Sequence, residues 1–349
     1  MMEYRTLGRT GHRVSALGLG TEYLIGDYVQ GSLTETIDAV LGRATEAGIN
    51  YVDLLYIEPE YWEMMGPILR PYRDRLLLAA HWGGAEYDIP TCVRTFDHIL
   101  RQVDNGYVEI AMFTMVDTQL KWRWAVESVE LLQRYREEGK VGAVGLATHT
   151  VPMVRQAVES GLVDVIMSPV NLASAYNGSA DILPICRDHG VGLVAMKPFG
   201  GGYILRNRPD EEPITPLQCL HYTLSQPVDT TVPGVRSLQQ LEAALEYLQA
   251  TDEEKDYTRA LARAREFMQG QCTYCNHCLP CPSGIDVGRT IALVDAIYTP
   301  KDELVPEYAV LPAPASDCTA CGVCMERCPF GVDVIEKMQK AVEVFESTA

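Results

Sequence analysis

Eight of the eleven cysteines fall in two short runs near the C-terminus, and their types and spacing suit metal or redox chemistry. The second run has gaps of two, two and three residues and ends before a proline: Cys318, Cys321, Cys324 and Cys328. The first run has gaps of two residues and also ends before a proline: Cys272, Cys275, Cys278 and Cys281. The spacing of the second run is typical of chains that bind two [4Fe–4S] clusters.

In that pattern three close thiolates hold one cluster, and the cysteine before the proline reaches the other. One cluster is therefore predicted to bind Cys272, Cys275, Cys278 and Cys328, and the other Cys281, Cys318, Cys321 and Cys324. The gap before Cys281 is one residue short of the pattern, so its role as a ligand stays open. Zinc also binds paired C-x2-C motifs and is the alternative metal. The other three cysteines, Cys92, Cys186 and Cys219, lie on apolar helical faces and are predicted to be core residues.

The elements that precede these runs predict a barrel. Eight short apolar stretches are predicted as buried strands, at residues 17–21, 49–56, 76–80, 107–113, 142–147, 163–168, 192–196 and 230–233. Predicted helices separate or follow most of them, at 33–47, 89–103, 124–138, 152–160, 182–189, 215–225 and 238–248. Apolar strands that alternate with helices indicate a parallel sheet, and eight units in about 250 residues fit a (β/α)8 barrel. An open doubly wound sheet is the competing architecture, but no G-x-G-x-x-G follows the first strand.

The character of the chain changes after residue 251, where a charged helical stretch leads into the cysteine runs. We place the domain boundary so that residues 1–268 form the barrel and residues 269–349 a small helical domain. Within the small domain we expect helices at 288–298 and 334–345, with a proline-rich loop at 305–314.

The overall charge limits the class of partner. The 349 residues include 29 Lys and Arg against 47 Asp and Glu, which gives a formal charge of −18. Nucleic acid and anionic membrane surfaces need basic patches, so neither is expected as a partner. The start of the chain has no apolar signal core, and no apolar run is long enough to span a membrane. We therefore expect a cytoplasmic location.

Motifs spread along the first 250 residues resemble the aldo-keto reductase superfamily. They occur in that family's order, at residues 4–11, 18–21, 48–53, 138–145 and 232–237. The resemblance implies a TIM barrel with an N-terminal hairpin. Together with the cysteine runs, the whole chain looks like the iron–sulfur branch of that superfamily, with a ferredoxin-like C-terminal domain.

The resemblance implies an active site that departs from the family's pattern. Family members use an Asp-Tyr-Lys-His tetrad, in which the tyrosine protonates a carbonyl while a nicotinamide delivers hydride. Only the aspartate is kept, as Asp53. Glu58 stands at the tyrosine position with Tyr56 close by, His81 at the lysine position, and Thr114 at the histidine position. A tyrosine needs a nearby cation to become an effective acid, so the family's ordinary route is not expected.

The family's nucleotide-binding positions are also partly changed. Arg236 and Ser237 stand where the family grips an adenosine phosphate, and Gln240 follows at the expected offset. Asn171 and the glycine loop around Gly201 are further candidates for cofactor contact, because backbone amides of glycines approach an anion closely. NADP(H) binding is left open, and a flavin is a possible mediator that no motif indicates.

Polar residues gather at the predicted C-terminal ends of the strands, where such barrels place their active sites. Besides Asp53, Tyr56, Glu58 and Thr114, they include Glu22, His81, Asp117, His149, Asn171, Lys197 and Arg236. Asp53, Tyr56, Glu58, His81, His149 and Lys197 are the candidate catalytic residues. His81 and His149 have the chemistry to act as acid and base, to bind an anion or to ligate a metal.

Three functions follow from these features. The first is an iron–sulfur oxidoreductase whose clusters pass electrons between a ferredoxin or other carrier and a small substrate in the barrel. The second is a lyase, dehydratase or isomerase that uses His81 and His149, with structural clusters. The third is an electron-transfer subunit whose acidic surface docks a basic partner.

Overall fold

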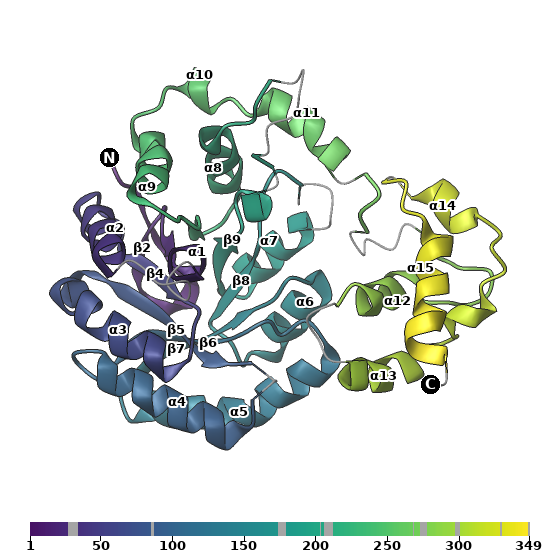
Figure 1. Cartoon of the computed structure of the whole chain (residues 1–349), viewed down its shortest axis with the longest axis horizontal. Coiled ribbons are helices and arrows are strands. Elements are labelled where there is room, and N and C mark those ends of the chain that lie inside the picture. The colour runs from purple at the N-terminus through teal and green to yellow at the C-terminus, as the bar shows by residue number, and fades with distance from the viewer. Residues whose placement is uncertain are drawn as a thin grey trace. The chain divides into compact units, whose positions relative to one another are not determined.

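A computed structural model describes residues 1–26, 34–84, 87–173, 179–202, 204–205, 212–267, 269–272, 278–296, 301–328 and 330–347 (Figure 1). The chain divides into two compact units, and the division falls between Ala260 and Leu261. This point lies inside helix α11 (Thr258–Phe267), whereas the sequence boundary was placed after that helix. The two units are described separately below.

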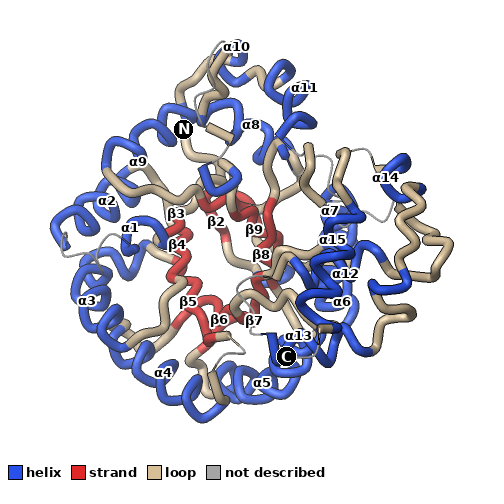
Figure 2. Tube along the Cα trace, turned by 45° about the vertical axis from the view of Figure 1, so that its right-hand side comes forward, coloured by secondary structure: helices blue, strands red, loops and turns tan. Residues whose placement is uncertain are grey.

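Eight strands of the first unit form one parallel sheet. They are β3 (Leu19–Gly20), β4 (Tyr51–Leu54), β5 (Leu77–Gly83), β6 (Val108–Phe113), β7 (Val141–Ala147), β8 (Val165–Pro169), β9 (Gly192–Met196) and β10 (Thr230–Val232). Each pairs with the next along the chain, and parallel bridges from Leu17 to Thr231 and from Gly20 to Gly234 join the first to the last. The sheet therefore closes into a (β/α)8 barrel, as predicted, and Figure 2 shows the strands as an inner ring with helices outside.

The helices of this unit surround the barrel, and most of them cover its outer face. They are α1 (Glu22–Gly26), α2 (Thr34–Glu46), α3 (Pro59–Leu69), α4 (Ile89–Gln102), α5 (Gln119–Glu137), α6 (Val151–Ser160), α7 (Ser179–Asp188), α8 (Pro216–Ser225), α9 (Leu238–Leu245) and α10 (Asp252–Lys255). Short 3-10 turns lie at Gly8–Thr10, Arg70–Arg75, Gly200–Gly202 and Glu246–Leu248. Apolar side chains on both faces of the strands explain their nearly continuous apolar sequences, because neither face meets water.

Helix α3 was missed by the sequence analysis. Two prolines, Pro59 and Pro67, lie in it and argue against a helix. Pro59 occupies the first turn, where proline costs little, and the buried side chains of Tyr61, Trp62 and Met65 hold the helix against the barrel. Tertiary packing therefore outweighs the local effect of Pro67.

The N-terminal hairpin fills the floor of the barrel. Strands β1 (Tyr4–Thr6) and β2 (Arg13–Ser15) pair antiparallel, as the resemblance implied. Leu7, directly after β1, and Val14, in β2, are fully buried in the barrel interior, in one cluster with Tyr51 at the start of β4. Gly8 lies so close to β9 that a Cβ on it would be 2.2 Å from the backbone nitrogen of Gly192. The hairpin is thus seated directly under the strands.

The second unit is helical and has its own core. Its helices after α11 are α12 (Val287–Val294), α13 (Lys301–Ala309), α14 (Val323–Arg327) and α15 (Val334–Ala341), with a 3-10 turn at Ala315–Asp317 and a π-helical turn at Val342–Glu346. The expected loop at 305–314 is wrong in its first half, because α13 continues through Pro306 to Ala309. Leu304 and Tyr308 of α13 are buried, and this packing stabilises the helix. In the described part of the chain, no helix is long and apolar enough to cross a membrane.

Candidate functional site

A hydrogen-bonded chain joins the ends of three neighbouring strands at the barrel mouth. His81 at the end of β5 lies with Nε2 3.1 Å from Oδ1 of Asp53 and with Nδ1 2.6 Å from Oγ1 of Thr114. When Asp53 is ionised it only accepts, so Nε2 donates to it and Nδ1 accepts from the Thr114 hydroxyl. The side chain of His81 is 1% exposed. Both ring nitrogens are therefore occupied, which suits His81 to orient Asp53 and Thr114.

The residue predicted at the family's tyrosine position, Glu58, is not joined to this chain among the described residues. Glu58 is exposed at the start of α3, where its carboxylate accepts from the amide of Ile57, and the described residues show no hydrogen bond from it to His81. The hydroxyl of Tyr56 donates to the carbonyl of Glu22 at 3.3 Å. Burial raises the pKa of Tyr56, with Glu22 and Glu58 adding to the rise. Nothing in this geometry makes Tyr56 a stronger acid.

A second polar chain crosses the mouth from β6 to β9. Nδ1 of His149 lies 3.0 Å from Oδ2 of Asp117, and Nε2 of His149 lies 3.0 Å from Nζ of Lys197. The other oxygen of Asp117 accepts from the amide of His149 at 2.7 Å and from the hydroxyl of Thr148 at 2.8 Å. The His149 side chain is 33% exposed, so this chain is open to solvent.

The neighbours of Asp117 determine the protonation state of its carboxyl group. Burial by itself would raise the pKa of this carboxyl, but the hydrogen bonds and charge of His149 and the hydroxyl of Thr148 outweigh burial and hold the pKa below its usual value. Asp117 is therefore ionised near neutral pH and accepts every hydrogen bond it makes.

The backbone of Lys197 is held in an unusual conformation by its neighbours. Its φ is +54°, in the left-handed region that a non-glycine residue rarely adopts. The side-chain amide of Asn171 and the backbone amide of Gly200 both donate to the carbonyl of Lys197, each at 2.9 Å. Gly201 follows in the same turn with φ +66°. The predicted residue Gly201 thus lies in the loop that presents Lys197, and Asn171 supports this loop from the end of β8.

The three candidate phosphate-binding residues lie together at the start of α9. The hydroxyl of Ser237 accepts from the amide of Gln240 at 3.3 Å, and the side chain of Gln240 accepts from the amide of Arg236 at 2.8 Å. The guanidinium of Arg236 lies over the ring of Tyr23, 5.0 Å from its centroid. A helix N-terminus with an arginine beside it suits an anion.

Four cysteines of one predicted ligand set line a single small cavity in the second unit: Cys281, Cys318, Cys321 and Cys324. Ile285 and Val334 form part of its apolar wall. Burial raises the pKa of the Cys324 thiol, and the charges of Cys318 and Cys321 add to the rise. The guanidinium of Arg327 also ties the two runs together, because it donates to the carbonyl of Pro280 at 3.0 Å.

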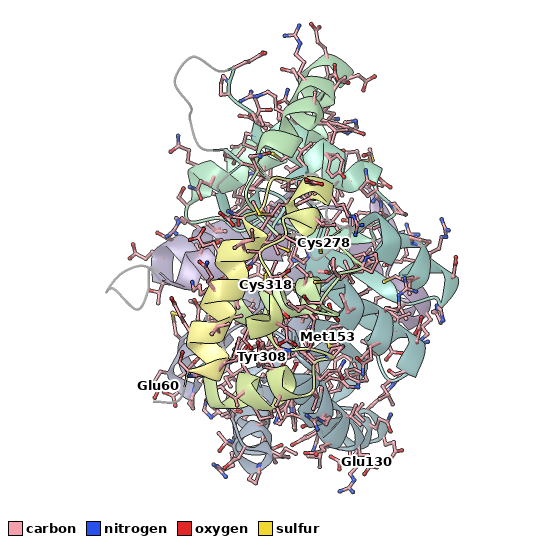
Figure 3. All side chains as sticks on the ribbon, turned by 90° about the vertical axis from the view of Figure 1, so that its right-hand side faces the viewer. Glu60, Glu130, Met153, Cys278, Tyr308 and Cys318 are labelled. Carbon is pink, nitrogen blue, oxygen red and sulfur yellow. The ribbon has the colours of Figure 1, made fainter. Side chains whose placement is uncertain are left out.

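The other predicted set is described only in part, because Cys275 lies outside the described residues. Cys272, Cys278 and Cys328 are partly buried against the core of the second unit, on which Figure 3 labels Cys278 and Cys318. Among the residues that the structure describes, no three or more ligand side chains are gathered as a metal site. The partly buried thiols against apolar side chains nevertheless have the donor chemistry that an iron–sulfur cluster requires.

The three cysteines outside the runs are core residues, as predicted. Cys92, Cys186 and Cys219 are at most 1% exposed. Burial raises the pKa of the Cys186 and Cys219 thiols to about 12, which makes them unreactive.

Sequence reasoning placed Asp117 and Thr114 at the mouth but did not pair them with the histidines. The pairing of Asp117 with His149 depends on the loop after β6. There the amide of Val116 donates to the carbonyl of Ala147 at 2.9 Å, which folds the loop over β7. A carboxylate just beyond one strand and a histidine just beyond the next strand are the signal that the sequence does contain.

An eight-stranded parallel barrel with polar chains at the C-terminal ends of its strands defines a (β/α)8 barrel of the enzymatic kind. Residues 16–218 match the aldo/keto reductase family, and the chain belongs to this family of oxidoreductases.

Curated relatives share part of the chain. L-galactose dehydrogenase of Arabidopsis thaliana is 28% identical over 227 residues, which are 60% of this chain and 69% of the relative. L-glyceraldehyde 3-phosphate reductase of Escherichia coli is 26% identical over 224 residues, which are 58% of this chain and 63% of the relative. The chain therefore covers about two thirds of the length of these relatives.

Solved structures support the fold. An aldo-keto reductase from Bacillus halodurans superposes with a TM-score of 0.60 at 20% identity, covering 76% of this chain and 97% of that one. A putative aldo-keto reductase from Pseudomonas aeruginosa gives a TM-score of 0.57 at 23% identity, covering 70% and 96%. At these identities the likeness concerns the barrel fold.

Proposed function

We propose that this protein is an iron–sulfur oxidoreductase that reduces a small carbonyl compound, or oxidises the matching alcohol, at the barrel mouth. The observation that supports it best is the cavity lined by Cys281, Cys318, Cys321 and Cys324, because these four cysteines are one complete predicted ligand set. The barrel belongs to an oxidoreductase family, so redox chemistry in both units is mutually consistent.

The clusters would be held by the thiolates of the two runs. Cys281, Cys318, Cys321 and Cys324 would hold one [4Fe–4S] cluster, and Cys272, Cys275, Cys278 and Cys328 the other. Such clusters supply single-electron transfer. Because a hydride carries two electrons, a flavin or a ferredoxin-like carrier is needed wherever clusters and nicotinamide exchange electrons.

In the barrel the tetrad is degenerate, and the residues present have other roles. Asp53, His81 and Thr114 form a rigid hydrogen-bonded chain that shapes the substrate site. Arg236, with Ser237 and Gln240, would bind the adenosine phosphate of NADP(H). A reduced nicotinamide bound there supplies hydride. The relatives named for L-galactose and L-glyceraldehyde 3-phosphate suggest small hydroxyaldehydes as the first substrates to try.

The non-redox alternative gains little from the structure. It requires His81 to exchange protons with a substrate, but His81 is 1% exposed and both of its nitrogens are engaged. The alternative of an electron-transfer subunit gives no role to the solvent-open chain of Asp117, His149 and Lys197.

The cluster proposal is tested by metal analysis of Cys321→Ala after anaerobic reconstitution. Cys321 is exposed, so its truncation leaves the core intact. We expect about eight iron atoms per chain in the unchanged protein and about four in the variant, with matching sulfide. Cys186→Ala, at a buried cysteine outside the runs, should keep all eight. Zinc without sulfide, or full iron content in Cys321→Ala, would contradict the assignment.

The cofactor proposal is tested by nicotinamide fluorescence. Arg236→Ala removes a cation from the predicted phosphate site, and loss of a charged hydrogen bond costs about 1.5 to 3 kcal/mol. We expect the Kd for NADPH to rise about 10- to 100-fold while that for NADH changes little. The control is Arg187→Ala, an exposed arginine on α7 that pairs with Asp188. Absence of NADPH binding by the unchanged protein at millimolar concentration would rule out nicotinamide as the hydride source.

A further inference from the structure

We infer that Asp117, His149 and Lys197 form a proton relay in which Lys197 exchanges a proton with the substrate oxygen and His149 exchanges it with solvent. The inference rests on the proposed function, because it supplies the proton that carbonyl reduction needs. The residues of this relay lie in the loops after β6, β7 and β9. Asp53 and Glu58, by contrast, lie in β4 and in the loop that follows it.

The hydrogen bonds determine the tautomer of His149. Asp117 accepts at both oxygens, so Nδ1 of His149 must carry a hydrogen and donate it to Oδ2. Nε2 faces the Nζ of Lys197 at 3.0 Å, and two N–H donors cannot bond to each other, so Nε2 carries a lone pair opposite the ammonium. An ammonium has three hydrogens to donate and no lone pair, so Lys197 donates to Nε2. One N–H of Lys197 points to His149, and among the described residues no acceptor is found for the other two.

The same contacts allow the proton to move. When Lys197 has lost a proton, Nε2 of His149 takes one from water and forms an imidazolium between Asp117 and Lys197. Asp117 stabilises that imidazolium, because its carboxylate lies 3.0 Å from Nδ1. The imidazolium then returns a proton to Lys197 across the 3.0 Å contact.

Solvent exposure distinguishes this relay from the hydrogen bonds that join Asp53, His81 and Thr114. The side chain of His149 is 33% exposed and Lys197 is exposed, whereas His81 is 1% exposed. Among the described residues, the charged groups that His149 contacts are Asp117 from the loop after β6 and Lys197 from the loop after β9. The neutral hydroxyl of Thr148 adds a hydrogen bond to Asp117. Burial raises the pKa of Tyr56, so this tyrosine is the weaker candidate for proton donor.

Carbonyl reduction through this relay transfers one hydride and one proton. The carbonyl carbon gains a hydride from a reduced nicotinamide, which is oxidised, and the C=O π bond breaks. The oxygen takes a proton from Lys197, so an N–H bond breaks and an O–H bond forms. Lys197, now a neutral amine, regains a proton from water through His149. Oxidation of the alcohol runs the same steps in reverse.

The first test needs no substrate and therefore stands apart from the proposed function. Long-range proton–nitrogen NMR of the imidazole rings reports which nitrogen carries hydrogen, and His149→Gln assigns the resonance of His149. We expect the Nδ1–H tautomer in the unchanged protein. In Lys197→Met we expect this preference to weaken, because Nε2 loses its donor. An Nε2–H tautomer in the unchanged protein would overturn the relay.

The second test is kinetic and uses L-glyceraldehyde 3-phosphate or L-galactose as probe with the matching nicotinamide. Lys197→Met should lower kcat by about 10² to 10⁴, the usual contribution of a general acid. Lys197→Arg should be equally impaired, because a guanidinium keeps the positive charge but does not give up its proton. His149→Gln should lower kcat and flatten its dependence on pH. His189→Gln, an exposed histidine on the outside of the barrel, should behave as the unchanged protein.

The paired lysine variants separate proton transfer from anion binding. If Lys197 only binds an anion, Lys197→Arg retains kcat, and Lys197→Met raises the KM or the Kd for NADPH instead. Either result overturns the relay. If no probe is turned over at all, the failure concerns the proposed function, and the tautomer measurement still decides the inference.

Discussion

At the scale of single residues, His81 and His149 show how surroundings assign different tasks to one residue type. Both lie at strand ends of the barrel mouth and both bond to an aspartate. His81 is enclosed with both nitrogens engaged by neutral or acidic partners, so it is suited to hold others in place. His149 lies between a carboxylate and an ammonium in contact with solvent, so it is suited to pass a proton.

Asp117 makes the stability of the barrel depend on pH. Its pKa is lower in the folded chain than in the unfolded one, so its stabilising effect is fully present above the unfolded value, near pH 4, and is lost as pH falls through the folded value. Asp117→Asn should therefore cost about 1 to 3 kcal/mol at pH 7 and progressively less from pH 4 towards pH 2. Thermal unfolding across this range measures the difference.

Asp188→Asn is the matched control, because Asp188 is exposed and pairs only with its neighbour Arg187 among the contacts described. It should change the melting temperature little at any pH. A cost for Asp117→Asn that stays constant down to pH 2 would show that lost packing, rather than the carboxylate, is responsible.

The sequence predicted which residues reach the mouth better than how they pair. Asp53 and His81 lie in the adjacent parallel strands β4 and β5, and Thr114 directly follows β6, so their meeting follows from strand order. The pairing of Asp117 with His149 depends on a loop in which Met115 adopts φ +46°, and residue types do not specify such a turn. Contacts set by the sheet are therefore predictable, and contacts set by loops are not.

At the scale of elements, the N-terminal hairpin is the part most sensitive to small changes. Gly8→Ala would add a Cβ 2.2 Å from the nitrogen of Gly192 at a φ of +45°, so the hairpin must move away from the barrel floor. We expect a loss of more than about 2 kcal/mol in stability. Urea unfolding followed by tryptophan fluorescence measures it, because all four tryptophans lie in the barrel: Trp62, Trp82, Trp122 and Trp124.

Gly11→Ala provides the comparison within the same hairpin. Gly11 also has a positive φ, +76°, but a Cβ there would meet no atom within 4 Å. Only backbone strain of about 1 kcal/mol is expected. Equal losses for the two variants would mean that the close approach to Gly192 has no energetic consequence.

The sequence did not predict two of the helices that contain an internal proline. Helices α3 and α13 contain Pro67 and Pro306, and both are held by buried aromatic residues such as Trp62 and Tyr308. Local propensity argues against both helices, and burial decides in their favour. The strands were easier to predict, because a strand buried on both faces appears in the sequence as a continuous apolar stretch.

At the scale of the whole molecule, the two units have separate cores. The barrel cores contain buried residues up to Leu245, and the core of the second unit contains buried residues from Ile285 onward. The change in composition at the cysteine runs indicated this division in the sequence. The sequence also predicted Cys281, Cys318, Cys321 and Cys324 as one set, but not the apolar side chains of Ile285 and Val334 that line the same cavity, because these depend on how the second unit folds.

The filled floor of the barrel has a consequence for the order of events during turnover. Leu7 and Val14 close the end of the barrel opposite the polar chains, so that end offers no passage to a reactant. If NADP(H) and a small substrate both bind at the mouth, as proposed, both must enter and leave through that open end of the barrel. The molecule that binds deeper in the barrel then has to bind first and dissociate last. The closed floor therefore favours an ordered mechanism of binding and release.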